Sequence, residues 1–200
     1  TVVVTMNMNP VISSVTASPA TICAGTTSTL TVQSIQGAPG TAQVGTESFT
    51  DITPSPYRGG SGSDCRNQML YTAAELTAAG LTAGPITSIS FNNVTSPSSA
   101  VNQLTISIGA TSATSLSSTF NTSPTTAVWG PVNFIPVLGV NTHTFSTPFV
   151  WDGVSSIIVN TCSPGGGGTS YSVSIGSVSG RSIQTATSGA CTATTGTSYN

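Results

Sequence analysis

The stretch Ile86–Ala110, ITSISFNNVTSPSSAVNQLTISIGA, contains two runs of strand-forming residues separated by a Ser/Pro-rich turn. The second run places Leu104, Ile106 and Ile108 at alternate positions, so that all three share one face. This period of two residues is typical of a β-strand that buries one side. Two such runs joined by a short turn predict an antiparallel sheet.

Further runs of the same kind follow towards the C-terminus, separated by Pro- and Gly-containing turns. The regular spacing of short strands with turn signals is typical of a β-sandwich. The runs are Val128–Val132, Thr142–Phe145, Phe149–Trp151, Ser155–Asn160, Tyr171–Ile175 and Ser182–Ala186. We therefore expect an all-β fold, an antiparallel jelly-roll-like β-sandwich over residues 41–200.

One segment departs from the strand pattern and predicts a short helix, YTAAELTAAGL at Tyr71–Leu81. Thr72 followed three residues later by Glu75 is a capping box, in which each residue satisfies the other's backbone amide. Gly80 suits the left-handed residue that ends a helix. Leu76 is expected on the buried side of this two-turn helix.

The N-terminal part divides into two segments. Residues 1–9 open on a β-branched run, which has high strand propensity. Residues 10–40 contain two or three short strands with turns at Ser18–Pro19 and Ala24–Gly25, which is half of an immunoglobulin-like hairpin pair. This partial immunoglobulin-like segment is too short to close a sandwich alone.

Charged residues are 4% of the chain, and the three basic residues are Arg58, Arg66 and Arg181. A nucleic-acid partner needs clustered cations, so the composition argues against one, and also against an anionic membrane surface. The chain has no apolar run long enough to span a bilayer, so we expect no membrane insertion. A neutral Ser/Thr/Asn/Gln surface is typical of secreted fibres and adhesins, in which neighbouring modules pack closely.

The four cysteines are Cys23, Cys65, Cys162 and Cys191. An even number without a CxxC motif favours two disulfides over a metal site in a secreted chain. Three connectivities are open, and we favour Cys162–Cys191 together with Cys23–Cys65. The alternative is buried free thiols.

The inventory of catalytic side chains predicts that the chain is not an enzyme. The single histidine, His143, lies on an alternating run without a nucleophile motif, and we expect it on the surface or on an edge strand. Asp152 lies in a Trp-Asp-Gly turn, where a carboxylate bonds nearby amides. Glu47 and Asp51 form a candidate Ca²⁺ pair, but calcium needs more oxygen ligands, so we expect no cofactor.

Aromatic side chains leave two interpretations open. Trp129 and Trp151 could form the sugar-stacking platform of a carbohydrate-binding module, with surface glycans as partners, or they could be core residues of the sandwich. Thr53–Asp64 is a Pro/Gly/Ser-rich loop, and its part Tyr57–Asp64 contains Arg58. A Gly-rich loop spans Gly165–Ser170. Both loops are candidates for ligand display.

Two longer stretches resemble a known repeat family. They are NQMLYTAAELTAAGLTAGPITSISF at Asn67–Phe91 and HTFSTPFVWDGVSSIIVNTC at His143–Cys162. Both are similar to repeats of the very large surface and secreted proteins, including gliding-motility adhesins, of gliding, type IX-secreting Gram-negative bacteria. The resemblance covers about Gln43–Asn200, and PVISSVTASPATICAGTTSTLTV at Pro10–Val32 resembles the immunoglobulin-like linkers of the same proteins.

The resemblance implies an extracellular structural role and no catalytic residues. In that family an end similar to GTSYN continues into one more strand, whereas this sequence ends at Asn200 and begins with an additional strand. We therefore expect the N-terminal strand to complete the sandwich of a neighbouring module, so that copies or adjacent repeats assemble head to tail into a filament or adhesin. The residues of this strand are Thr1, Val2, Val3, Val4, Thr5 and Met6.

Overall fold

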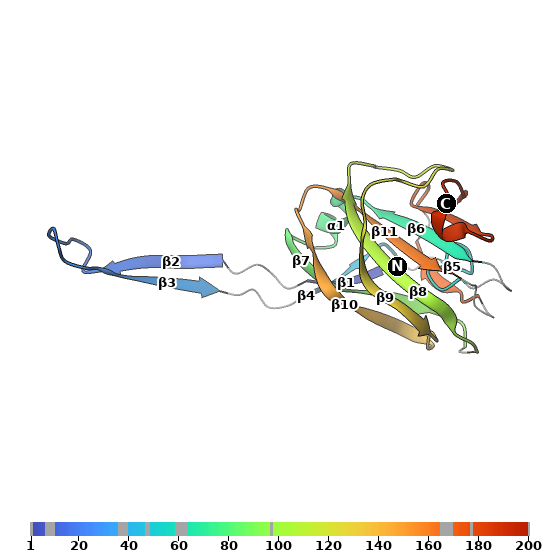
Figure 1. The fold of residues 1–200 in the computed structure, drawn as a ribbon, viewed down its shortest axis with the longest axis horizontal. Helices are drawn as coiled ribbons and strands as arrows, with labels where there is room; N and C mark the ends of the chain where they lie inside the picture. Colours follow the sequence, from blue (N-terminus) through green and yellow to red (C-terminus); the bar gives the residue numbers. More distant parts are fainter. Residues whose placement is uncertain are drawn as a thin grey trace.

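The computed structural model describes residues 2–6, 11–35, 40–46, 49–58, 64–96, 98–164, 170–176 and 178–199. Within these residues, two six-stranded antiparallel sheets pack face to face as a sandwich, and a separate two-stranded hairpin projects from it (Figure 1). The predicted all-β sandwich is therefore confirmed. No helix in the described ranges is long and apolar enough to cross a membrane.

The first sheet has the strand order β4–β1–β7–β12–β5, and β10 also pairs with β7. Its strands are β1 (Val2–Met6), β4 (Gly40–Val44), β5 (Phe49–Asp51), β7 (Gly84–Asn93), β10 (Gly139–Trp151) and β12 (Val173–Ile175). The second sheet has the order β14–β13–β6–β11–β8–β9. Its strands are β6 (Cys65–Tyr71), β8 (Val101–Thr111), β9 (Thr126–Phe134), β11 (Ser156–Ser163), β13 (Ser182–Ala186) and β14 (Thr197–Tyr199).

The core lies between the two sheets and is built by the alternation that the sequence displays. On β8, Leu104, Ile106 and Ile108 are all buried, as predicted. Strand β7 buries both Ile86 and Ile89, although an odd spacing puts two residues on opposite faces of a regular strand. The pairing registers of β1 and β10 both skip Thr87, so a bulge there turns both side chains inward.

The predicted helix is present as α1 (Ala73–Ala78). The Thr72 hydroxyl accepts the Glu75 amide at 3.4 Å, and a Glu75 carboxylate oxygen accepts the Thr72 amide at 2.7 Å, which confirms the capping box. Gly80 follows the helix with φ +92°, the left-handed conformation expected of a stop residue. Leu76 is 1% exposed and anchors the helix to the core.

The N-terminal strand belongs to the sandwich of its own chain. β1 pairs with β4 from Val2↔Val44 to Met6↔Gly40, and with β7 on its other side. Val2 and Val4 are buried in the core. The expectation that residues 1–9 complete a neighbouring module is therefore wrong, because both edges of β1 already have partners within the chain.

The segment expected to be half of an immunoglobulin-like pair is a single hairpin inserted between β1 and β4. It consists of β2 (Val11–Ser18) and β3 (Thr29–Ile35), which pair antiparallel from Val11↔Ile35 to Ser18↔Thr29. Figure 1 shows this hairpin extending away from the sandwich. We call residues 11–35 the arm.

One of the two predicted disulfides is present. Cys162 on β11 is bonded to Cys191 in a short 3₁₀ helix, Ala190–Thr192, with the two Cα atoms 5.6 Å apart. Cys23 is exposed near the end of the arm, whereas Cys65 is buried on β6, and both are free thiols. The predicted Cys23–Cys65 pairing is wrong because the arm carries Cys23 away from the sandwich.

Candidate functional site

The arm has two chemically different faces, and both are exposed. Residues directly opposite each other in an antiparallel pair share a face, and the register pairs Val15 with Val32 and Ala17 with Leu30. Val15, Val32 and Leu30 are 57%, 56% and 69% exposed. These four residues are the arm's apolar face, and the other face carries hydroxyls: Thr16, Ser18, Thr29 and Thr31.

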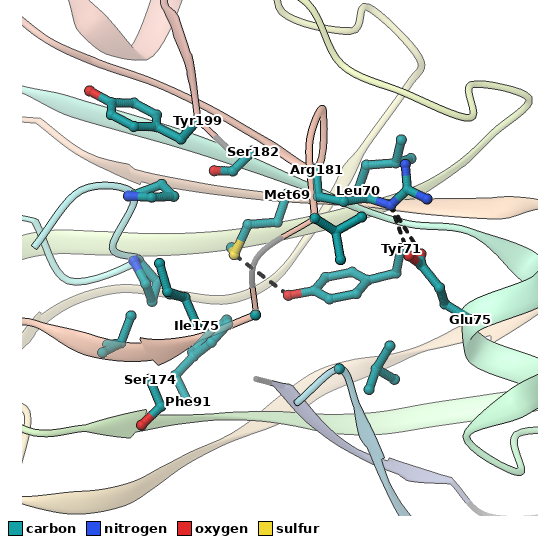
Figure 2. Close-up of a pocket in the computed structure, with 17 residues that line it drawn as sticks. Met69, Leu70, Tyr71, Glu75, Phe91, Ser174, Ile175, Arg181, Ser182 and Tyr199 are labelled. Atoms are coloured by element: carbon teal, nitrogen blue, oxygen red, sulfur yellow. Dashed lines mark hydrogen bonds and ion pairs between the residues drawn. The ribbon is translucent and has the colours of Figure 1, made fainter. Parts of the chain in front are cut away.

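An apolar pocket opens at the side of the sandwich, where the ends of strands from both sheets meet (Figure 2). Its cavity volume is about 130 Å³. This is smaller than a typical small-molecule site, which measures roughly 300–1,000 Å³. We call it the lateral pocket. Its lining includes Val44, Met69, Tyr71, Phe91, Ile175 and Val178.

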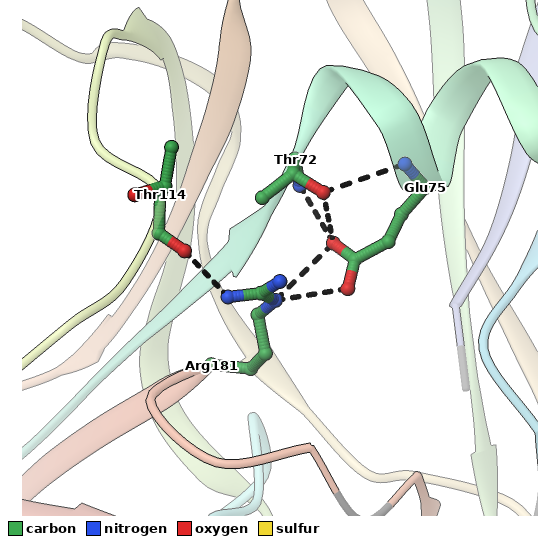
Figure 3. A network of polar contacts seen from close by, with 4 residues as sticks. All are labelled: Thr72, Glu75, Thr114 and Arg181. Atoms are coloured by element: carbon green, nitrogen blue, oxygen red, sulfur yellow. Dashed lines mark hydrogen bonds and ion pairs between the residues drawn. The ribbon is translucent and has the colours of Figure 1, made fainter.

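Glu75 and Arg181 form one rim of the lateral pocket, and both belong to the network of polar contacts drawn in Figure 3. The Arg181 Nε atom donates to the Glu75 carboxylate at 2.9 Å, and Arg181 Nη1 donates to the Thr114 carbonyl at 2.6 Å. Partial burial on its own would raise the pKa of Glu75, but hydrogen bonds from Thr72 and the nearby Arg181 outweigh it and lower that pKa. The rim is thus a neutral pair that holds α1 against the loop before β13.

We expect Glu75→Ala to lower the free energy of unfolding by about 1–2 kcal/mol, because the variant loses both a helix cap and an ion pair. Glu75→Gln keeps the side-chain acceptor for the Thr72 amide and should lose less than half as much. Urea unfolding followed by circular dichroism measures both values. Equal losses in the two variants would contradict the capping role.

The single histidine is a core residue. His143 is completely buried on β10, so the expectation of a surface histidine is wrong. The alternative expectation, an edge strand, fits β10, which among the described strands hydrogen-bonds only to β7. Its Nε2 atom lies 2.6 Å from the Tyr57 hydroxyl, and the rings of Trp129 and Phe134 pack edge-on against it. Burial lowers the pKa of His143 to about 4. The imidazole is therefore neutral and closed off from any solute.

The aromatic residues expected to display or stack on a ligand lie mostly inside the sandwich. Tyr57 and Trp151 are 0% and 1% exposed, so their assignment to display loops is wrong. Trp129 is half-buried and packs edge-on against Phe134 at a ring-centroid distance of 5.5 Å. Arg58 donates to the Gln184 side chain at 3.1 Å. A coplanar, exposed aromatic pair for a sugar is therefore not formed by these residues.

The acidic side chains that the structure describes hold local backbone. Asp152 accepts the amides of Val154 and Ser155 at 2.9 and 2.8 Å, as expected for its turn. Asp51 accepts the Thr53 amide at 2.9 Å. Glu47, the other member of the candidate Ca²⁺ pair, lies outside the described residues. Among the described residues no group of three or more His, Cys, Asp or Glu side chains could hold a metal.

The two predicted display loops lie partly within the described residues. Residues 59–63 of the first loop and 165–169 of the second lie outside the described part of the chain. Asp64, at the end of the first loop, accepts the Gly189 amide at 2.8 Å.

The predictions from sequence include neither the apolar face of the arm nor the lateral pocket. The face could have been found, because Val15 and Ala17 alternate with hydroxyl residues and so do Leu30 and Val32. The pocket has no comparable signal, since its lining comes from strands and loops distant in the sequence. Only the packed sheets bring these side chains together.

Comparisons of the chain with protein-family models, with curated proteins and with solved structures find no match. The fold itself defines the class of protein: an all-β antiparallel sandwich with one disulfide and a projecting hairpin.

Proposed function

We propose that this protein is a structural module of an extracellular filament or adhesin, and that it works by associating with copies of itself or with adjacent repeats. The single observation that carries the proposal is the arm. A two-stranded hairpin with exposed aliphatic side chains on one face is marginally stable in water, so a partner surface is needed to cover it.

The surface chemistry supports the same proposal. All three arginines contact their own chain: Arg58 contacts Gln184, Arg66 contacts Asn160 and Arg181 contacts Glu75. The remaining surface is made largely of hydroxyls and amides, and a formal net charge of −2 gives little repulsion between copies. The Cys162–Cys191 disulfide is consistent with an oxidising compartment outside the cytoplasm.

The resemblance of residues 67–91 and 143–162 to repeats of large bacterial surface adhesins points to the same role. Assembly by donation of the N-terminal strand is not part of this proposal, because β1 fills its own sheet. Any link between modules must therefore use another segment.

Negative-stain electron microscopy of the native material tests the proposal. We expect elongated assemblies with a regular axial repeat. Monodisperse single particles at every accessible concentration would contradict a filament role, and capture of a soluble sugar by such particles would favour a carbohydrate-binding module.

The neutral surface also predicts an unusual tolerance of salt. The described residues contain one ion pair, Arg181–Glu75, and exposed ion pairs contribute little to stability. We expect the melting temperature to change by less than about 2 °C between dilute and molar NaCl, because screening has few charges to act on. Differential scanning fluorimetry measures this shift, and a large one would show that long-range charge interactions matter here.

A further inference from the structure

We propose that the arm of one copy docks against the lateral pocket of the next copy and places one of its aliphatic side chains inside it. The inference rests on the proposed structural function and names the contact that would build the assembly. It commits to one occupant of the pocket, the uncharged hairpin of a second molecule.

The arm needs an apolar partner along its length. Strand β2 has eight residues and spans roughly 26 Å at about 3.3 Å per residue. Its side chains at Val15 and Ala17, with Leu30 and Val32 from β3, form a continuous aliphatic strip that no described part of the chain covers. Ile22, in the turn at the end of the arm, is 48% exposed and extends the apolar surface to the tip.

The lateral pocket matches the arm in chemistry. It is lined mainly by apolar side chains, including Val178, which is 47% exposed at its mouth. The arm, residues 11–35, contains no charged residue. Docking would therefore bury no unpaired charge from the arm. The charged groups at the rim, Glu75 and Arg181, already pair with each other.

Among the described strands, two that stand at the edge of their sheet end beside the pocket. Val44 ends β4 and Tyr199 ends β14, and each strand stands at the edge of its sheet. An incoming hairpin can hydrogen-bond to such an edge while one of its aliphatic side chains enters the pocket. The contact would thus satisfy backbone groups as well as bury apolar surface.

The arm and the pocket lie at opposite ends of the β1–β4 ribbon. The arm leaves this ribbon beyond Met6 and Gly40, whereas Val44 and Gly45 at the other end line the pocket. A contact between two different patches of the same molecule is heterologous, and its repetition produces a closed ring or an open filament.

The experiment uses the full chain in sedimentation velocity over a range of concentrations, with one variant blocking each side of the contact. Leu30→Asp puts a charge on the arm's apolar face, and Val178→Asp puts one at the mouth of the pocket. We expect the wild-type chain to form oligomers that grow with concentration. Each variant alone should associate at least about tenfold more weakly, because a buried aliphatic contact is lost and a charge is introduced.

Mixing the two variants gives the sharpest result. The Leu30→Asp chain keeps an intact pocket, and the Val178→Asp chain keeps an intact arm. The mixture should therefore form a 1:1 heterodimer that does not grow further. Pairing of arm with arm would instead make Leu30→Asp defective and leave Val178→Asp normal, which would overturn the proposal.

Two matched controls separate docking from a general effect of charge. Thr31→Asp adds the same charge to the hydroxyl face of the arm, next to Leu30. Leu138→Asp changes a residue that is 63% exposed in the β9–β10 turn and is not part of the pocket lining. Both controls should associate like the wild-type chain. Loss of association in either control would overturn the proposed contact.

The outcomes also separate this inference from the proposed function. If the wild-type chain forms oligomers and both blocking variants still do so normally, the docking contact is wrong while the filament role stands. If the wild-type chain stays monomeric at every concentration and the native material shows no assemblies, both proposals are wrong. Melting curves of each variant confirm that the sandwich is folded in every comparison.

Discussion

Reducing the Cys162–Cys191 disulfide should lower the free energy of unfolding by about 3.5 kcal/mol, since the bond closes a loop with a sequence separation of 29 residues. The bond connects strand β11, at the centre of the second sheet, to the 3₁₀ helix before β14. Without it the unfolded chain gains conformational freedom, and the C-terminal segment is attached to the sandwich by packing and hydrogen bonds alone. For a chain of this size we expect the melting temperature to fall by about 7–14 °C.

Thermal unfolding with and without a reducing agent measures this effect. The double variant Cys162→Ala/Cys191→Ala should melt at the temperature of the reduced wild-type chain and should not respond to reduction. Cys23→Ser is the matched control, because Cys23 is an exposed free thiol on the arm, and this variant should respond as the wild-type chain does. If the wild-type chain melts at the same temperature with and without the reducing agent, the bond does not stabilise the fold.

The second large effect is a loss of stability in mild acid. Burial lowers the pKa of His143 to about 4, whereas an unfolded histidine titrates near 6.5. Between these values the unfolded chain binds a proton that the folded chain does not, so stability falls as the pH falls. We expect a loss of about 2.5 kcal/mol between pH 7 and pH 4.5.

The chain is well suited to this measurement because His143 is its single histidine. The groups that face it are the Tyr57 hydroxyl and the rings of Phe91, Trp129 and Phe134, so no carboxylate among these contacts supports its charged form. Carboxylates such as Glu75 and Asp152, whose pKa values are lowered in the fold, add to the loss mainly below this window.

A paired variant isolates the histidine. Tyr57→Phe/His143→Phe removes both polar partners and keeps two rings of similar shape, so its stability at pH 7 should be close to that of the wild-type chain. Its stability should then be flat between pH 7 and pH 4.5. His143→Phe alone leaves the Tyr57 hydroxyl buried without its partner and should cost about 1–3 kcal/mol at pH 7. An acid-induced loss that persists in the paired variant would assign the titration to another group.

The sequence by itself determined the class of fold and much of its local structure. The alternating apolar residues Leu104, Ile106 and Ile108 are a local pattern that spans only a few positions. The capping box of Thr72 and Glu75 is equally local. Such patterns predict which face of a helix or strand is buried, because side chains on one face recur with the period of the backbone. The Cys162–Cys191 pairing was also predictable, since the pair closes a local loop near the C-terminus.

Local patterns gave a wrong boundary where two predicted strands merge. Thr142–Phe145 and Phe149–Trp151 are parts of one long strand, β10. Strand β6 was not predicted, since Cys65–Tyr71 contains polar residues that are buried in the second sheet. Burial on both faces of a strand removes the alternation on which such predictions depend.

Only the tertiary structure decided the partner of the N-terminal strand, the burial of His143 and Tyr57, and the lateral pocket. Each of these depends on contacts between residues far apart in the chain: Val2 pairs with Val44 and Phe91, and the Tyr57 hydroxyl meets His143 across 86 positions of sequence. Propensity and spacing carry no information about such distances. Packing two sheets against each other fixes them, because a buried polar group must find its hydrogen-bond partner within the same core.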